Sequence, residues 1–182
     1  MKKTLLTAFV LALAAGAANA QMNSGSKEYS YLGLGGGLAA PLQDYPTDVT
    51  QPPVFKLFAG RMLDDYFGIQ GELSGLIYPT GGGTVYDVRG TLLMKLVGPF
   101  GVVQPYFLLG TGSGVKVNTN VTYGLASYYD IFTFLLASGV GVQFEVAKGF
   151  FLYTEGQVDF NIGGSYTTID IPVMAGLSFR MN

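Results

Sequence analysis

The sequence predicts an all-β protein: an eight-stranded antiparallel up-and-down transmembrane β-barrel that follows a cleaved signal peptide. Three observations lead to this fold class. Charged residues make up only 12% of the 182 residues, roughly half the fraction that is typical of soluble domains. Apolar and polar residues alternate in eight separate runs, and this is the period of a β-strand. Past residue 20, no apolar run is long enough for a spanning helix, and a closed barrel is the other structure that satisfies its backbone in lipid.

The first 20 residues have the three parts of a secretory signal peptide. Lys2 and Lys3 supply the positive start, residues 5–15 form the apolar stretch, and Ala-Asn-Ala at positions 18–20 is a cleavage site of small residues. A transmembrane helix is the alternative, but it needs about 20 apolar residues and this run is shorter. We therefore expect cleavage after Ala20, with residues 1–20 as the signal peptide and residues 21–182 as one barrel domain.

Four runs with a period of two lie in the first half of the chain. Residues 29–38 place leucines on one face and glycines and tyrosines on the other. Residues 54–62 alternate Phe, Leu and Ala with Lys, Phe and Gly. In residues 67–77, apolar side chains oppose Gln, Glu and Ser, and in residues 86–96 they oppose Asp, Arg, Thr and Lys. Each run therefore predicts a strand with two unlike faces.

Four similar runs follow in the second half. Residues 103–115 set Phe and Leu against Tyr and glycines, and residues 132–145 set Phe, Leu and Val against Thr, Gly, Gln and Glu. Residues 152–162 oppose apolar side chains to Tyr, Glu, Gln, Asp and Asn. Residues 169–179 oppose Ile, Val, Leu and Phe to Asp, Met, Gly and Ser. An even number of strands lets both chain termini lie on the periplasmic side.

The two faces of these runs favour a membrane over water. One face is nearly free of charge over about 10 residues per strand, as a tilted membrane strand requires. The other face carries Gly, Tyr, Gln and charges of both signs, which suits a narrow, packed interior. A soluble secreted barrel or sandwich, the alternative, would carry many Lys, Glu and Thr on its outward face. The side chains predicted to face lipid are Leu32, Leu34, Phe55, Leu57, Ile69, Leu73, Val88, Leu92, Phe107, Leu109, Phe134, Val140, Val142, Leu152, Val158, Phe160, Val173, Leu177 and Phe179.

The connections between runs differ in length, as they do in outer-membrane barrels. The long links at residues 39–52 and 116–130 are predicted to face outward, and the short links at residues 63–66, 97–101 and 147–149 to face the periplasm. Arg61 is the one charge on the lipid-facing side of its run. Because it adjoins a short link, we place it at the headgroup level, where the cost of about 2–4 kcal/mol for a charge at the midplane fades.

Charges on the inward face predict a network of ion pairs, because buried ions need partners of opposite sign. If a hairpin turns at residues 81–82, Glu72 is diagonal to Arg89, and we expect this pair to be the firmest. Asp159 and Asp170 are expected to lie nearly opposite each other, where they could hold Ca²⁺, although a solvated rim is the simpler interpretation. Such a network would fill an eight-stranded barrel, whose interior is only wide enough for side chains. The predicted lumenal charge network consists of Lys56, Glu72, Asp87, Arg89, Lys95, Glu145, Glu155 and Asp159.

Several kinds of chemistry are excluded by composition. The chain has no Cys and no His, so it lacks thiolate nucleophiles, Cys-ligated metals and the commonest general base. Its net charge of −2 offers no basic surface for nucleic acid. Residues 35–40 match the spacing G-x-G-x-x-A, but Pro41 stands where a dinucleotide site needs a helix. We predict no catalytic residue, no cofactor and no metal.

Four segments carry a resemblance: YLGLGGG at residues 31–37, QPY at 104–106 with LGTG at 109–112, SGVGV at 138–142, and IPVMAGLSFR at 171–180. They resemble the small outer-membrane β-barrel family of Gram-negative bacteria, the porin-like or outer membrane protein A-type barrels. The resemblance covers residues 27–182 and implies insertion by the barrel assembly machinery. That family usually ends on an aromatic residue that the machinery reads. Here Met181 and Asn182 stand at the end, so the signal is expected to shift to Phe179.

The leading hypothesis is a non-enzymatic protein of the outer membrane of a Gram-negative bacterium, with a packed polar lumen. It would support the envelope, or contact an extracellular partner through residues 39–52 and 116–130. The alternative is a small porin-like pore or transport protein. A lipid-modifying enzyme is disfavoured because those chemistries usually employ His. A soluble ligand-binding barrel would be recovered without detergent.

Overall fold

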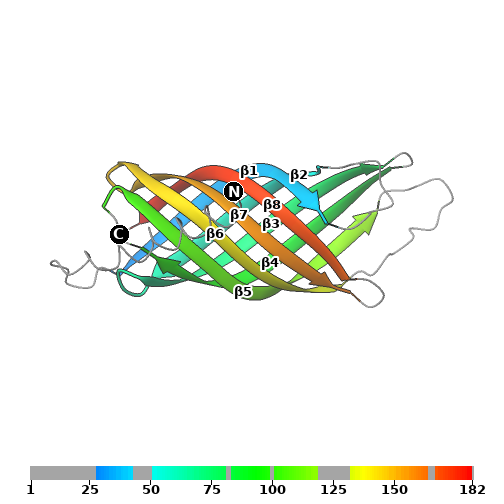
Figure 1. The fold of residues 1–182 in the computed structure, drawn as a ribbon, viewed down its shortest axis with the longest axis horizontal. Coiled ribbons are helices and arrows are strands. Elements are labelled where there is room, and N and C mark those ends of the chain that lie inside the picture. The colour runs from blue at the N-terminus through cyan, green and yellow to red at the C-terminus, as the bar shows by residue number, and fades with distance from the viewer. Residues whose placement is uncertain are drawn as a thin grey trace, which may run out of the picture.

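The computed structural model describes residues 28–42, 51–80, 83–98, 101–118, 132–163 and 167–181. Its eight strands are β1 (Tyr29–Pro41), β2 (Pro53–Met62), β3 (Phe67–Thr80), β4 (Gly83–Val97), β5 (Val103–Asn118), β6 (Thr133–Ala147), β7 (Phe150–Ile162) and β8 (Thr167–Met181). Each strand pairs antiparallel with the next, and β8 pairs with β1 to close the barrel (Figure 1). The predicted fold class is confirmed, and each predicted run overlaps one strand.

Some predicted features lie outside the described residues. They are the signal peptide at residues 1–20 and the central parts of the two long links, residues 43–50 and 119–131. Among the residues that the structure does describe, no helix is long and apolar enough to cross a membrane.

Side chains alternate between the outside and the inside of the barrel, because successive residues of a strand point to opposite faces. In β6, every second residue from Thr133 to Gln143 is buried, and those between are exposed or half-buried. Every side chain predicted to face lipid lies on the outer face: Val142, Val158 and Leu177 are half-buried, and the others are 39–61% exposed. Arg61 is also exposed, and its Nη2 lies 2.6 Å from Glu28 Oε2.

The chain enters and leaves the barrel at the same end, where the short turns also lie. Ser30 of β1 pairs with Met181 of β8. In the β2–β3 turn, Asp64 Oδ1 accepts hydrogen bonds from the backbone N–H groups of Tyr66 and Phe67, at 2.7 and 2.6 Å. In the β6–β7 turn, Gly149 adopts a φ of 74°, a left-handed conformation that favours glycine.

The ladder between β7 and β8 is interrupted near the end of the barrel opposite to the chain termini. Gly156 pairs with Val173 and Asp159 with Asp170, but the two pairs between them are missing. Pro172 lies in this gap, and proline has no N–H to donate to a ladder. The register confirms that Asp159 and Asp170 face each other across this hairpin.

The interior is filled by side chains. A large apolar cluster lies between the middle of the barrel and the short turns: Tyr31, Phe58, Met62, Leu93, Val97, Tyr106, Leu108, Ala137 and Tyr153. A smaller one lies toward the opposite end: Ala39, Val54, Leu76, Tyr78 and Met174. Glycines of β1 make room for the rings, since a Cβ on Gly33 would overlap the Phe58 ring and a Cβ on Gly35 the Tyr153 hydroxyl. Residues 35–40, which match the spacing G-x-G-x-x-A, therefore belong to strand β1 and form part of the barrel wall.

Candidate functional site

The middle of the lumen holds a buried lysine between two glutamates, which we call the Lys56 cluster (Lys56, Glu72 and Glu155). Lys56 Nζ lies 2.9 Å from Glu72 Oε1 and 2.5 Å from Glu155 Oε1. These side chains are at most 3% exposed. Since Lys56 comes from β2, Glu72 from β3 and Glu155 from β7, the cluster joins two neighbouring strands to β7, which pairs with neither of them.

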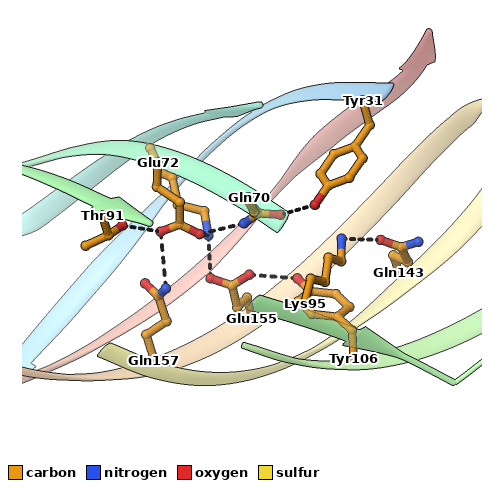
Figure 2. A network of polar contacts seen from close by, with 10 residues as sticks. Tyr31, Gln70, Glu72, Thr91, Lys95, Tyr106, Gln143, Glu155 and Gln157 are labelled. Carbon is orange, nitrogen blue, oxygen red and sulfur yellow. Dashed lines mark hydrogen bonds and ion pairs between the residues drawn. The ribbon is translucent and has the colours of Figure 1, made fainter. Parts of the chain in front are cut away.

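Neutral side chains complete the bonding of the two glutamates (Figure 2). Glu72 accepts hydrogen bonds from Gln70 Nε2 at 2.6 Å and from Gln157 Nε2 at 3.2 Å. Glu155 Oε2 accepts a hydrogen bond from the Tyr106 hydroxyl at 2.8 Å. Buried ions are tolerated when partners of this kind satisfy their remaining lone pairs.

Lys95 lies beside this network (Figure 2), on the side of the short β2–β3 turn, because it pairs with Gly68. Its Nζ lies 4.7 Å from the ring centre of Tyr31 and 4.4 Å from that of Tyr106, and it donates a hydrogen bond to Gln143 Oε1 at 3.0 Å. No carboxylate among the described residues lies within ion-pair distance of this ammonium. The faces of the two tyrosine rings attract the buried Lys95 ammonium in place of a carboxylate.

A second charged group, the Arg89 cluster (Asp87, Arg89, Asp159 and Asp170), lies on the other side of the Lys56 cluster. Arg89 Nη2 donates to Asp87 Oδ2 at 2.7 Å and to Asp170 Oδ2 at 2.5 Å, and Nη1 donates to Asp159 Oδ2 at 3.0 Å. The four side chains are at most 7% exposed. The guanidinium thereby connects β4 with β7 and β8 across the lumen.

The structure places most of the predicted lumenal charges inside the barrel. Glu145 is half-buried and lies apart from the network, because its Oε1 accepts a hydrogen bond from the backbone N–H of Gly149 at 2.9 Å in the β6–β7 turn. The buried members are Lys56, Glu72, Asp87, Arg89, Lys95, Glu155 and Asp159.

The prediction that Glu72 pairs with Arg89 is wrong. The two residues are diagonal across the β3–β4 ladder, as expected, with Glu72 opposite Thr91 and Arg89 opposite Ser74. Glu72 is bound instead by Lys56, and Arg89 turns toward the carboxylates of β4, β7 and β8. The partners across the lumen outcompete the diagonal neighbour.

The predicted charge network leaves out several neutral members, and it leaves out Asp170, which the sequence places opposite Asp159. Their signal was present in the pattern, because all of them lie on the inward phase of their strands. The missed residues are Tyr31, Gln70, Tyr106, Gln143, Gln157, Asn161 and Asp170.

The buried charged side chains of this interior bond to one another and occupy the lumen. Asp159 and Asp170, which could have shared Ca²⁺, each place Oδ2 on Arg89. Within the described part of the chain, no group of three or more acidic side chains is arranged to hold a metal ion. Opposite charges from facing strands meet inside the lumen.

A closed eight-stranded barrel with an apolar outer face and an ion-paired interior defines a transmembrane barrel of the outer-membrane type. A family model confirms the class, because the Outer membrane protein beta-barrel domain matches residues 7–179. The chain belongs to this outer-membrane β-barrel family.

Solved structures with the same fold share little sequence with the chain. Neisserial surface protein A (NspA) has a TM-score of 0.66 at 10% identity, covering 87% of this chain and all (100%) of its own. Ail, the attachment invasion locus protein of Yersinia pestis, solved with the heparin analogue sucrose octasulfate, has a TM-score of 0.63 at 18% identity, covering 85% and 99%. The N-terminal β-barrel domain of Pseudomonas aeruginosa OprF has a TM-score of 0.53 at 14% identity, covering 85% and 100%. No curated protein matches the sequence.

Proposed function

We propose that the chain is a non-enzymatic, non-conducting protein of the outer membrane of a Gram-negative bacterium, which supports the envelope and presents its long links to an extracellular partner. The plugged lumen is the observation that carries this proposal. The Lys56 and Arg89 clusters bridge facing strands, and the two apolar clusters fill the interior beside them. A small pore, the alternative function, needs a continuous water path in the space that these side chains occupy.

The absence of His from the sequence supports a non-enzymatic role. Acyl hydrolysis and transfer need a general base matched to the working pH, and His is the usual one. The buried carboxylates are engaged with Lys56 and Arg89. Purified barrel incubated with labelled phospholipid should therefore release no fatty acid, and turnover would contradict this part of the proposal.

The charge of the long links bears on the kind of extracellular partner. Ail was solved with a polyanionic heparin analogue. In this chain, residues 39–52 contain Asp44 and Asp48 and no Lys or Arg, and residues 116–130 contain one Lys and one Asp. Because a polyanion needs basic partners, we expect these links to contact neutral or aromatic surfaces and not sulfated sugars. Titration with sucrose octasulfate should give no heat of binding, whereas saturable binding would contradict this partner class.

Conductance in a planar bilayer tests the plug. We expect the purified protein to insert without current steps. A matched variant, in which Lys56, Glu72 and Glu155 are all replaced by Ala, removes the central bridge and should raise the conductance if the barrel still forms. Regular current steps from the natural sequence would overturn the proposal and favour the pore.

The predicted insertion route is also part of the proposal. We infer that the chain is exported, cleaved after Ala20 and inserted by the barrel assembly machinery. An outer-membrane fraction should contain a protein whose gel mobility changes on boiling, as detergent-resistant barrels do. Its N-terminus should begin at Gln21, and a protein recovered in the aqueous fraction with residue 1 intact would contradict this route.

A further inference from the structure

The Arg89 cluster carries more negative than positive charge. Asp87, Asp159 and Asp170 surround one guanidinium, and the nearest second cation, Lys116 Nζ, lies 4.0 Å from Asp87 Oδ2. With both cations counted, one negative charge is left uncompensated. The Lys56 cluster differs, because with Lys95 it contains two cations and two carboxylates. Uncompensated charge is costly at a buried site, so the imbalance at the Arg89 cluster needs a cause.

The Arg89 cluster also lacks hydrogen-bond donors. Each of its three carboxylates places Oδ2 on Arg89, and no described residue donates to the Oδ1 atoms of Asp87, Asp159 or Asp170. The adjacent Asn161 donates to Asp170 at 2.9 Å, while its own Oδ1 has no partner in the described part of the chain. Ionised carboxylates only accept hydrogen bonds, so these oxygens cannot satisfy one another.

An independent observation comes from β6. The Thr133 hydroxyl is buried, with the residue 5% exposed, and no described side chain or backbone group bonds to it. A Cβ built on Gly114 would lie 2.9 Å from Thr133 Oγ1 and 3.4 Å from Asp87 Oδ1. Both oxygens therefore border the same space beside Gly114. A threonine hydroxyl can both donate and accept hydrogen bonds, so Thr133 is a further buried polar group beside the cluster that has no partner among the described residues.

We propose that the folded barrel binds one proton at the Arg89 cluster, and that this proton makes the end of the lumen opposite to the short turns sensitive to pH. The proton comes from water and binds to a carboxylate Oδ1, where it removes the excess negative charge and supplies a donor. Asp159 is the carboxylate that takes it. Asp170 has Asn161 as a second donor and Asp87 has Lys116 nearby, whereas Asp159 makes one bond to Arg89, at 3.0 Å.

The surrounding elements define the charges that act on this proton. The titratable and charged groups that face the cluster are Tyr78 and Glu72 from β3, Asp87 and Arg89 from β4, Lys116 from β5, Asp159 from β7 and Asp170 from β8. When the proton leaves, Asp159 and Asp170 repel each other across a part of the β7–β8 ladder that lacks two pairs. The β7–β8 ladder is therefore weakest where the two carboxylates repel each other.

The sign of the pH dependence follows from linkage. Unfolded aspartates release their protons near pH 4, so above about that pH the folded barrel holds one more proton than the unfolded chain. The unfolding equilibrium constant should then rise with pH, by up to about tenfold per pH unit. Stability should be highest in mild acid, fall with rising pH while only the folded state holds the proton, and level off once the folded cluster has lost it.

Urea unfolding of the purified barrel in detergent micelles, from about pH 5 to about pH 9, tests this slope. Asp159→Asn keeps the shape and removes the charge, so it should flatten the slope and be more stable than the natural protein at high pH. Glu28→Gln is the matched control, because it removes an exposed carboxylate outside the lumen, and its slope should match the natural protein. A natural protein without a slope, or a slope that Asp159→Asn leaves unchanged, overturns the proposal.

Infrared spectroscopy gives a readout that does not depend on the variant's folding. The folded natural protein should show the carbonyl band of a buried protonated carboxyl group in mild acid, and high pH should remove it. An absent band at every pH would overturn the proposal. So would a stability that depends on added Ca²⁺ and its chelation at constant pH, since a metal would then supply the missing charge.

Discussion

Replacing Lys56 by Met isolates the contribution of the central ion pairs to stability. Lys56 Nζ bonds both Glu72 and Glu155, and lies 5.2 Å from the Phe58 ring centre and 5.8 Å from that of Tyr153. Methionine has similar length and no charge, so the apolar packing of the stem should survive. The variant leaves two buried carboxylates without their cation.

The size of the destabilisation depends on the hydrogen bonds that Glu72 and Glu155 retain in the Lys56→Met variant. Removing one partner of a buried ion pair typically costs about 3–5 kcal/mol. Glu72 retains its bonds from Gln70 and Gln157, and Glu155 retains that from Tyr106. We therefore expect the lower end of the range, about 3 kcal/mol, which raises the unfolding equilibrium constant roughly 100-fold.

Urea unfolding in detergent micelles, followed by tyrosine fluorescence and gel mobility, measures this change. Arg61→Met is the control, because the exposed Arg61–Glu28 pair is of a kind that contributes only about 0–1 kcal/mol. The triple variant Lys56→Met, Glu72→Gln, Glu155→Gln removes the three charges of the Lys56 cluster and leaves Lys95 with its two tyrosine rings and Gln143. It should regain part of the loss, since replacement of buried ion pairs is often tolerated. An unchanged Lys56→Met variant would refute the reasoning, and a triple variant no more stable than the single one would attribute the loss to packing.

Two further predictions concern the wall and the C-terminal strand. Gly35→Ala should destabilise the barrel by about 1–3 kcal/mol through overpacking, because its Cβ would overlap the Tyr153 hydroxyl, whereas Gly75→Ala has open space; urea midpoints compare the two, and equal midpoints would contradict the close packing. Phe179→Ala should lower the amount of heat-modifiable protein in the outer membrane several-fold, and Phe150→Ala, which removes the same ring contact at 4.9 Å, should lower it less. If both variants assemble alike, Phe179 acts through packing and not as the assembly signal.

The faces of the strands could be predicted from the sequence because they depend on local alternation alone. A residue's parity within its run decides whether it points in or out, so Leu32 and Leu92 lie outside and Lys56 and Glu72 lie inside. Hairpin registers were also accessible where a small turn fixes the centre, as for Asp159 and Asp170.

The partners across the lumen could not be predicted in the same way. They depend on the tilt and stagger of the strands, which accumulate around the closed barrel and are not visible in any one hairpin. The sequence predicts a pair between Glu72 and Arg89 only because their strands follow each other in the chain. Lys56 instead meets a glutamate that is 99 positions away, and Arg89 meets an aspartate that is 81 positions away.

The filled interior also constrains where the protein could recognise a partner. The outer face is apolar around the barrel, which suits lipid, and the lumen is occupied by the two charged clusters and the apolar residues beside them. The turns at the end with the chain termini are short and bonded to themselves, as Asp64 is to the backbone of Tyr66 and Phe67. The strand ends that residues 39–52 and 116–130 connect lie at the other end, and the Arg89 cluster lies toward that same end. A loss of its proton would loosen the wall beneath those links, so pH and partner contact would act on one region of the molecule.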